Sequence, residues 1–144
     1  IDNDRADIGR MSGAAGVHVG QEDLAPPDVR SVVGPDALVG LSTHTEAQVE
    51  DGLAQPVSYL AIGPVFETTS KGRPADAVVD LIGIKRAAVH TARLGVPLVA
   101  IGGTTLERAG QMFDAGASSI AVISDLLAGG SVAARARAFV HAVA

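Results

Sequence analysis

The sequence of 144 residues contains no cysteine and no tryptophan, and its aromatic residues are one tyrosine and three phenylalanines. Without cysteine the chain forms no disulfide and offers no thiolate, which is compatible with the reducing cytoplasm in which we expect the protein. Basic residues are also scarce, because 11 Lys and Arg stand against 16 Asp and Glu and give a net charge of −5. This balance argues against nucleic acid as a partner, since a nucleic-acid-binding protein needs a basic face.

The sequence also lacks a long hydrophobic run. No apolar stretch approaches the roughly 18 residues of a membrane-spanning helix, so we expect no membrane partner. The chain begins at Ile1 without a methionine, and a targeting segment would therefore not be visible. The apolar residues that are present, 47% of the total, are mostly small aliphatics, and they are accompanied by 17 glycines. This composition predicts one α/β domain over residues 1–144, with close packing of helices on strands.

Six short segments predict buried parallel strands: five are apolar, too short for helices and too continuous for half-exposed strands, and a sixth, Ile1–Asp4, is clipped at the terminus. They are Ile1–Asp4, Gly16–Gly20, Ala37–Ser42, Tyr59–Phe66, Pro97–Gly103 and Ser119–Ser124. The intervening segments predict helices. These are Pro27–Val33, Glu46–Leu53, Ala77–Leu94, Leu106–Ala115 and a closing helix at Val132–Val143. Thr45 is a suitable N-cap for the second helix, and Gly116 is a suitable stop for the fourth.

Regular alternation of strands and helices predicts βαβ units and a parallel sheet. Two architectures satisfy this pattern, an open doubly wound sheet and a (β/α)₈ barrel. Because a barrel usually needs over ~200 residues, six strands indicate either an open sheet or a barrel that lacks about its first two βα units.

In both architectures the active site lies at the carboxyl ends of the strands. Each predicted strand here is followed by polar or glycine residues. In chain order these are Asn3–Arg5, Gln21–Asp23, Ser42–Thr45, Thr68–Lys71, Gly102–Thr105 and Ser124–Asp125. We therefore expect a functional site on this edge of the sheet.

Asp4 and Asp23 follow neighbouring strands, which lie about 4.8 Å apart in a sheet. Two carboxylates so close repel each other unless a proton or a cation lies between them. Mg²⁺ prefers such oxygen ligands and is often completed by substrate phosphate. The simpler alternative makes Asp4 a solvated strand end and Asp23 a helix N-cap.

Two other loops predict anion binding. Gly102 and Gly103 allow the backbone to approach a phosphate, although the same pair also suits a helix-entry turn. Lys71 is a point charge suited to phosphate oxygens, and it follows three hydroxyl residues, Thr68, Thr69 and Ser70. A solvated loop is the alternative for that segment.

The histidines give weaker signals. His18 points away from its neighbours Val17 and Val19, and we interpret it as a hydrogen-bonded structural histidine. His44 lies in a loop after a strand, where it is either an acid–base group or a plain loop residue. We find no Ser-His-Asp pattern and no zinc-type spacing, so no residue is predicted as a catalytic nucleophile.

Taken in order, these loops resemble thiamine phosphate synthase. The matching stretches are Asn3–Arg5, GVHVGQED at Gly16–Asp23, GLSTHT at Gly40–Thr45, GPVFETTSK at Gly63–Lys71, AIGG at Ala100–Gly103 and AVIS at Ala121–Ser124. The family is a (β/α)₈ barrel that joins hydroxymethylpyrimidine diphosphate to thiazole phosphate and releases diphosphate in thiamine biosynthesis. The resemblance therefore implies a transferase acting on two phosphorylated small molecules, with Mg²⁺ as cofactor.

The resemblance also implies roles for individual residues. The metal ligands would be Asp4 and Asp23. Asn3, Ser42 and Lys71 would hold the pyrimidine diphosphate. The thiazole-phosphate side would be lined by Thr68, Thr69 and Ser70, and its phosphate would be held by Gly103, Ile123 and Ser124. The family route is dissociative: a pyrimidine-methyl cation forms and the thiazole nitrogen captures it, so no protein nucleophile is needed.

Related functions are also open. The thiazole tautomerase shares the fold but lacks the acidic pair and typically has a histidine where this chain has Pro64. A non-catalytic phosphate-binding paralogue is the second alternative. Against the family pattern, the chain lacks the first two βα units, and Thr104 replaces an apolar residue. We therefore expect a truncated, partial barrel with little or no turnover by itself. Barrels of this type often pair, which makes a homo-oligomer a further expectation.

Overall fold

Six parallel strands form one sheet in the computed structural model, which describes residues 1–68 and 77–142. They are β1 (Asp2–Asn3), β2 (Gly16–Val19), β3 (Leu38–Thr43), β4 (Tyr59–Ile62), β5 (Leu98–Ile101) and β6 (Ser119–Ala121). Their order in the sheet is their order in the chain, and every neighbouring pair is parallel. A doubly wound sheet reverses its strand order at a switch point. The sequential order found here excludes that alternative.

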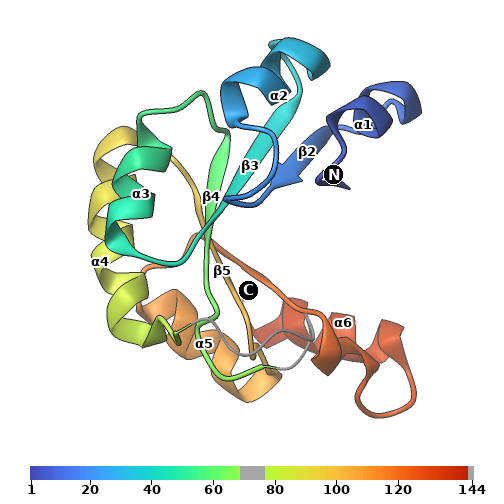
Figure 1. The fold of residues 1–144 in the computed structure, drawn as a ribbon. Coiled ribbons are helices and arrows are strands. Elements are labelled where there is room, and N and C mark those ends of the chain that lie inside the picture. The colour runs from blue at the N-terminus through green and yellow to red at the C-terminus, as the bar shows by residue number, and fades with distance from the viewer. Residues whose placement is uncertain (69–76, 143–144) are drawn as a thin grey trace.

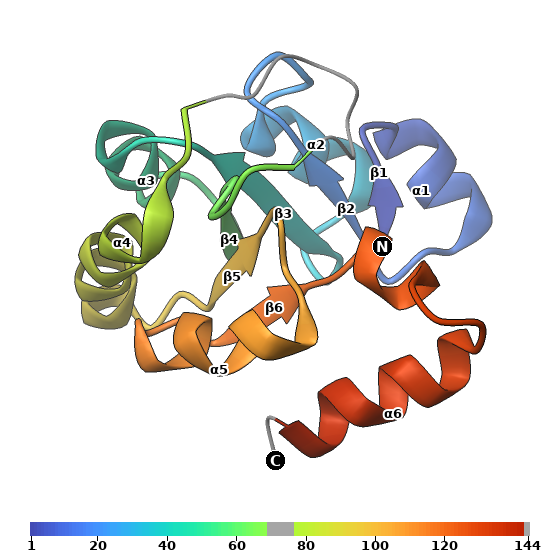
Figure 2. The ribbon, with the colours of Figure 1, turned by 90° about the horizontal axis from the view of Figure 1, so that it is seen from below.

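Helices follow the strands one by one. They are α1 (Ala6–Ser12), α2 (Pro26–Val33), α3 (Glu46–Leu53), α4 (Asp80–Leu94), α5 (Leu106–Asp114), the 3₁₀ helix η1 (Ser124–Leu127) and α6 (Val132–Ala142). Figures 1 and 2 show that the sheet curls and that α1 to α5 lie on its convex outer side, while α6 packs against α5 and η1. The architecture is therefore an α/β half-barrel with six strands.

The predicted element ends are partly confirmed. The Thr45 hydroxyl accepts a hydrogen bond from the backbone N–H of Gln48 at 3.2 Å, so Thr45 is the N-cap of α3. Gly116, with φ of +105°, follows the end of α5 as predicted. The predicted helix Ala77–Leu94 begins later, at Asp80. The predicted strand Tyr59–Phe66 ends at Ile62, just before the Gly63-Pro64 break.

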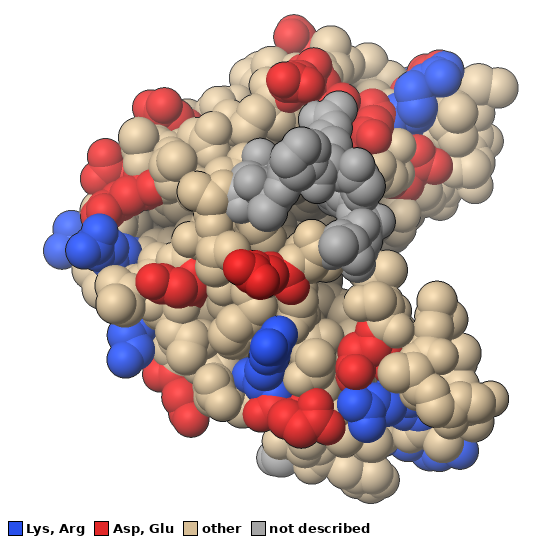
Figure 3. Space-filling view, turned by 60° about the horizontal axis from the view of Figure 1, so that its bottom comes forward, with Lys and Arg blue, Asp and Glu red and all other residues tan. Residues whose placement is uncertain are grey.

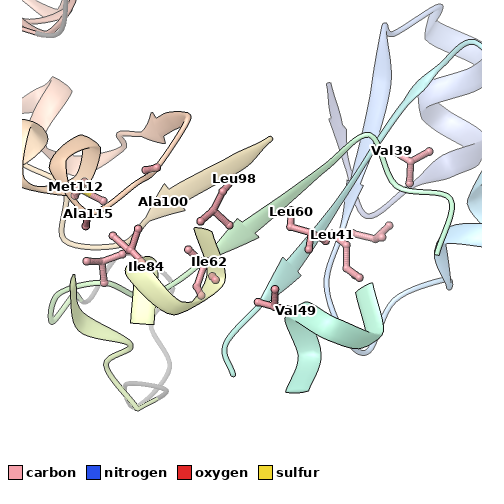
Figure 4. Packing of buried hydrophobic residues seen from close by; sticks show 14 of the residues in the cluster. Val39, Leu41, Val49, Leu60, Ile62, Ile84, Leu98, Ala100, Met112 and Ala115 are labelled. Carbon is pink, nitrogen blue, oxygen red and sulfur yellow. The ribbon is translucent and has the colours of Figure 1, made fainter. Parts of the chain in front are cut away.

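The hydrophobic core lies between the sheet and the helices. Alternate strand residues share one row across the sheet, in which Val19 pairs with Leu41, Leu41 with Leu60, and Leu60 with Leu98. All four side chains are buried, and they pack with helix residues that include Val49, Ile84 and Met112 (Figure 4). Each fully buried aliphatic side chain contributes about 1.5–3 kcal/mol to stability. This outer layer leaves the concave side of the sheet for other residues.

The concave side carries the residues that alternate with the core row. His18, Gly40 and Tyr59 share one register across β2, β3 and β4. His18 therefore points opposite to Val17 and Val19, as the sequence predicted. In the described part of the chain, no helix has the length and apolar character that crossing a membrane requires.

Candidate functional site

The first polar residues at the carboxyl edge of the sheet follow β1. Asn3 ends this strand, and the next residue, Asp4, donates its backbone N–H to the carbonyl oxygen of His18 at 2.8 Å. This bond extends the pairing of β1 with β2 by one residue. Asp4 has φ of +67°, a left-handed conformation that is uncommon outside glycine. Both side chains are exposed.

The loop after β2 is closed by the Asp23 carboxylate. Oδ2 of Asp23 accepts a hydrogen bond from the backbone N–H of Gly20 at 2.7 Å. Helix α2 begins at Pro26 and its N-cap is Ala25, so the alternative that Asp23 caps this helix is wrong. The prediction that Asp4 and Asp23 follow neighbouring strands is confirmed by the pairing of β1 with β2. Within residues 1–68 and 77–142, no three His, Cys, Asp or Glu residues gather as a metal cluster.

Three side chains from adjacent strands form a hydrogen-bonded row on the concave side. Nδ1 of His18 lies 2.9 Å from the Tyr59 hydroxyl, and Nε2 of His18 lies 2.8 Å from the Ser42 hydroxyl. The Ser42 carbonyl accepts a further bond from the Gln21 side-chain amide at 2.6 Å. The interpretation of His18 as a hydrogen-bonded histidine is thus confirmed. Burial raises the pKa of Tyr59, because it disfavours the charged phenolate.

His44 joins the ends of β3 and β4. Its Nδ1 lies 2.5 Å from the Gly63 carbonyl oxygen, and its backbone N–H donates to the Gln48 side chain at 2.7 Å. A carbonyl oxygen only accepts hydrogen bonds, so Nδ1 carries the proton. This contact gives His44 a structural position between two strands.

Gly102 and Gly103 let the segment after β4 lie directly against the end of β5. Both have positive φ, 98° and 63°, and a Cβ at Gly102 would lie 2.6 Å from Cα of Pro64. The Phe66 backbone N–H donates to the Gly102 carbonyl at 3.1 Å. The close approach predicted for these glycines is therefore made first of all by the chain itself. A phosphate contact at Gly103 stays a prediction.

The start of α5 is joined to the segment after β6. Oδ2 of Asp125 accepts a hydrogen bond from the backbone N–H of Leu106, the first residue of α5, at 3.2 Å. The Arg135 guanidinium on α6 holds the same carboxylate with two nitrogens. These contacts bring Ser124, the residue before Asp125, to the side of the sheet edge where Gly103 lies.

Comparisons with known proteins decide the family. The family model described as thiamine monophosphate synthase matches residues 1–126. The chain belongs to this family. A thiamine-phosphate synthase of Koribacter versatilis is 50% identical over 125 residues, which cover 87% of this chain and 57% of the relative. A thiamine-phosphate synthase of Azorhizobium caulinodans is 40% identical over 137 residues, covering 95% of this chain and 63% of the relative.

A solved structure extends the likeness to the fold. The thiamine phosphate pyrophosphorylase from Pyrococcus furiosus superposes with a TM-score of 0.84 and 26% sequence identity, covering 98% of this chain and 65% of that chain. The chain thus spans less than two thirds of the length of these family members.

Several of the site residues that the family resemblance implies lie at the carboxyl edge of the sheet. Asn3, Asp4, Asp23, Ser42, Gly103 and Ser124 all lie at or just after the carboxyl ends of their strands. Ile123 and Ser124 are exposed at the start of η1, and Thr68 is half-buried. Thr69, Ser70 and Lys71 lie outside the described residues. Figure 3 shows basic and acidic side chains interspersed, without a broad basic area on this face.

Three residues with specific contacts were missed by the sequence reasoning. The sequence predicted Tyr59 only as part of a strand, and Arg135 only as part of the closing helix. Arg108 donates to the Gly103 carbonyl at 3.0 Å, and its guanidinium lies 4.5 Å from the centre of the Phe66 ring. No local pattern indicated the contact of His18 with Tyr59, because it depends on the register of β2, β3 and β4.

Proposed function

We propose that the chain provides the carboxyl-edge site of a thiamine phosphate synthase, a transferase that joins hydroxymethylpyrimidine diphosphate to thiazole phosphate. Family membership and the shared sheet edge support this proposal. The observation that carries it is that, within the described residues, polar or glycine residues follow each of the six strands at the same edge of the sheet. Such groups suit two phosphorylated substrates and a cation.

We also propose that the six strands belong to a (β/α)₈ barrel that needs about two further βα units to close. The one-sided helices, the sequential strand order and the shorter length relative to family members support this proposal. Open sheet edges expose unpaired backbone groups. In an unclosed barrel the substrate pocket would lack one wall, so we expect little turnover without those units.

Asp4 and Asp23 have the donor chemistry for Mg²⁺. Both are exposed carboxylates beyond neighbouring strands, and the Gly20 N–H fixes Asp23 through one oxygen only. Hard oxygen ligands, completed by water and substrate phosphate, are what this ion prefers. When bound there, Mg²⁺ would neutralise negative charge on the diphosphate.

Residues at the same edge of the sheet would make the contacts with the two substrates. Asn3 and Ser42 would bind the pyrimidine diphosphate, while Gly103, Ile123 and Ser124 would hold the thiazole phosphate. The bond between the pyrimidine methylene carbon and the diphosphate oxygen breaks, and its electron pair leaves with the diphosphate. The thiazole nitrogen lone pair then forms the new C–N bond. Hydrogen-bond donors aimed at the departing diphosphate stabilise the developing charge, and no protein nucleophile takes part.

From the sequence alone, we also propose that Lys71 contacts the diphosphate and that Thr68, Thr69 and Ser70 line the thiazole side. A positive charge at Lys71 would stabilise the departing diphosphate. A cytoplasmic location and a homo-oligomer complete the proposal, and cell fractionation and light scattering would test them.

A coupled assay with both substrates and Mg²⁺ tests the function. It would compare this chain with a chimera that carries the first βα units of the Koribacter versatilis relative ahead of Ile1. We expect thiamine phosphate from the chimera and little from the chain alone. Full turnover by the chain alone would contradict the need for more βα units. An inactive but folded chimera that still binds phosphate would favour the non-catalytic paralogue, and proton transfer on the thiazole alone would favour the tautomerase.

A further inference from the structure

The His18 ring lies between two hydroxyl groups from the two strands that follow β2. Its Nδ1 is 2.9 Å from the Tyr59 hydroxyl, and its Nε2 is 2.8 Å from the Ser42 hydroxyl. The rings of His18 and Tyr59 are also stacked, with centroids 5.5 Å apart and planes 23° apart. The imidazole therefore connects the start of β4 with the end of β3.

This connection depends on Gly40, which lies between the two rings in the sheet. His18 pairs with Gly40, and Gly40 pairs with Tyr59. A Cβ on Gly40 would lie 2.4 Å from the Tyr59 hydroxyl and 2.5 Å from Nδ1 of His18. Two strands that are not neighbours can exchange this bond only because the strand between them carries no side chain here.

The proton positions along the row follow from the chemistry of the three groups. Burial raises the pKa of Tyr59, so its phenol keeps the proton. The described residues offer this hydroxyl no hydrogen-bond partner besides Nδ1 of His18. We therefore assign the phenol as donor and Nδ1 as acceptor. A neutral imidazole then carries its proton on Nε2 and donates it to the Ser42 oxygen.

We propose that Tyr59 is a positioning residue that acts through His18 to make Ser42 a hydrogen-bond donor toward an anionic oxygen. A serine hydroxyl has one proton, and when its oxygen accepts from Nε2, that proton is directed elsewhere. An anion accepts hydrogen bonds and never donates them, so a phosphate needs Ser42 as donor. Only the identity of this anion, a diphosphate group, rests on the proposed function.

The Tyr59→Phe variant should reverse the direction of the hydrogen bond between His18 and Ser42. Without the phenol proton, Nδ1 loses its donor, and the imidazole is free to carry its proton on Nδ1 instead. Ser42 can then donate its hydroxyl proton to Nε2, so this proton is no longer available for a hydrogen bond to an incoming anion. Phe keeps the stacked ring, so the packing against His18 is retained.

The first experiment is ¹⁵N NMR of histidine-labelled protein at about pH 8.5, where an ordinary imidazole is neutral. The His18 signals, assigned with the His18→Gln variant, report which ring nitrogen carries the proton. We expect the Nε2–H form in the wild type and a shift of population toward Nδ1–H in Tyr59→Phe. A wild-type ring with its proton on Nδ1, or an unchanged ring in the variant, would overturn the positioning role.

The second experiment measures binding of inorganic diphosphate by calorimetry. We expect about tenfold weaker binding in Tyr59→Phe and in Ser42→Ala, as for one hydrogen bond to a charged group. The double variant should bind no more weakly than Ser42→Ala, because both changes remove the same donor. Additive losses, or unchanged binding in Tyr59→Phe, would overturn the proposal.

Thr43→Val is the matched control. The Thr43 hydroxyl lies next to Ser42 on β3 but is buried on the helix side, where it donates to the Ala61 carbonyl at 2.9 Å. Its removal should leave both the His18 proton and diphosphate binding unchanged. A wild-type chain that binds no diphosphate would overturn the proposed function and the donor role of Ser42 together. A wild-type His18 ring with its proton on Nδ1 would overturn the role of Tyr59 alone.

Discussion

Arg135 holds Asp125 with two guanidinium nitrogens, at 2.9 and 3.0 Å from the two carboxylate oxygens. Asp125 in turn accepts from the backbone N–H of Leu106 at 3.2 Å. One ion pair thus joins α6, η1 and the start of α5. Its side chains are 25% and 11% exposed, so water screens this pair less than an ion pair on the open surface.

Arg135→Ala should therefore destabilise the chain by about 1–3 kcal/mol, because it leaves a largely buried carboxylate without its partner. Urea unfolding followed by circular dichroism measures this loss. Arg137→Ala is the control: it removes the same side chain from the exposed side of α6. Equal effects of the two substitutions would contradict the stabilising role of the Asp125 pair.

Removal of the Thr104 hydroxyl should stabilise the chain, in contrast to Arg135→Ala. This residue is 5% exposed, and its Oγ1 is the one buried side-chain polar atom of the described residues that has no hydrogen-bond partner. A buried hydroxyl without a partner costs about 1–3 kcal/mol. Thr104→Val should thus raise the free energy of unfolding by about 1 kcal/mol.

The control for Thr104 is Thr91→Val, because the Thr91 hydroxyl is also buried but bonds the Ala88 carbonyl at 3.3 Å. That substitution should not stabilise the chain. If Thr104→Val were destabilising, the hydroxyl would have a partner such as an ordered water, and the cost assigned to it would be wrong.

Gly40 and Gly110 make a matched pair of glycine substitutions. A Cβ at Gly40 would lie 2.1 Å from Cζ of Tyr59, whereas a Cβ at Gly110 on α5 would meet nothing within 4 Å. Gly40→Ala should destabilise by about 1–3 kcal/mol through overpacking. Gly110→Ala should stabilise by about 0.5–1 kcal/mol, since alanine is the better helix residue. Thermal unfolding of both variants checks this, and a stable Gly40→Ala protein would contradict the close contact of His18 with Tyr59.

The sequence predicted the positions of all six strands because five of them lie in short apolar segments bounded by Gly, Pro or polar residues, whereas the ends of β4 and β6 were predicted too far along the chain. It did not predict α1. The residues that α1 buries are Ala6 and Gly9, and its larger residues Ile8 and Met11 are exposed. A Cβ at Gly9 would lie 2.6 Å from Val17, so this helix packs through small residues and shows no hydrophobic period.

The sequence predicted the candidate site only in part. Residues at strand ends could be located because parallel strands bring their carboxyl ends to one edge. Their partners could not, because the contact of His18 with Tyr59 spans 41 residues and depends on strand register. The pairing of Arg135 with Asp125 likewise depends on how α6 packs after η1, which no local pattern encodes.

Asp23→Asn tests the proposed cation ligand. Asparagine keeps an oxygen that can accept the Gly20 N–H, which Asp23 now binds at 2.7 Å, so the loop should keep its shape while the charge is lost. Because Mg²⁺ prefers charged oxygen ligands, we expect Mg²⁺-dependent binding of inorganic diphosphate to weaken by about tenfold, or 1.4 kcal/mol. Binding in the presence of EDTA should not change.

Asp28→Asn is the control for this prediction, because it makes the same change in net charge in the first turn of α2 and not in the loop that Asp23 closes. Its diphosphate binding should match that of the wild type with and without Mg²⁺. Equal weakening in both variants would assign the effect to overall charge, and unchanged Mg²⁺-dependent binding in Asp23→Asn would remove Asp23 from the proposed metal site. A loss limited to Asp23→Asn and to solutions with Mg²⁺ is the result that a direct ligand requires.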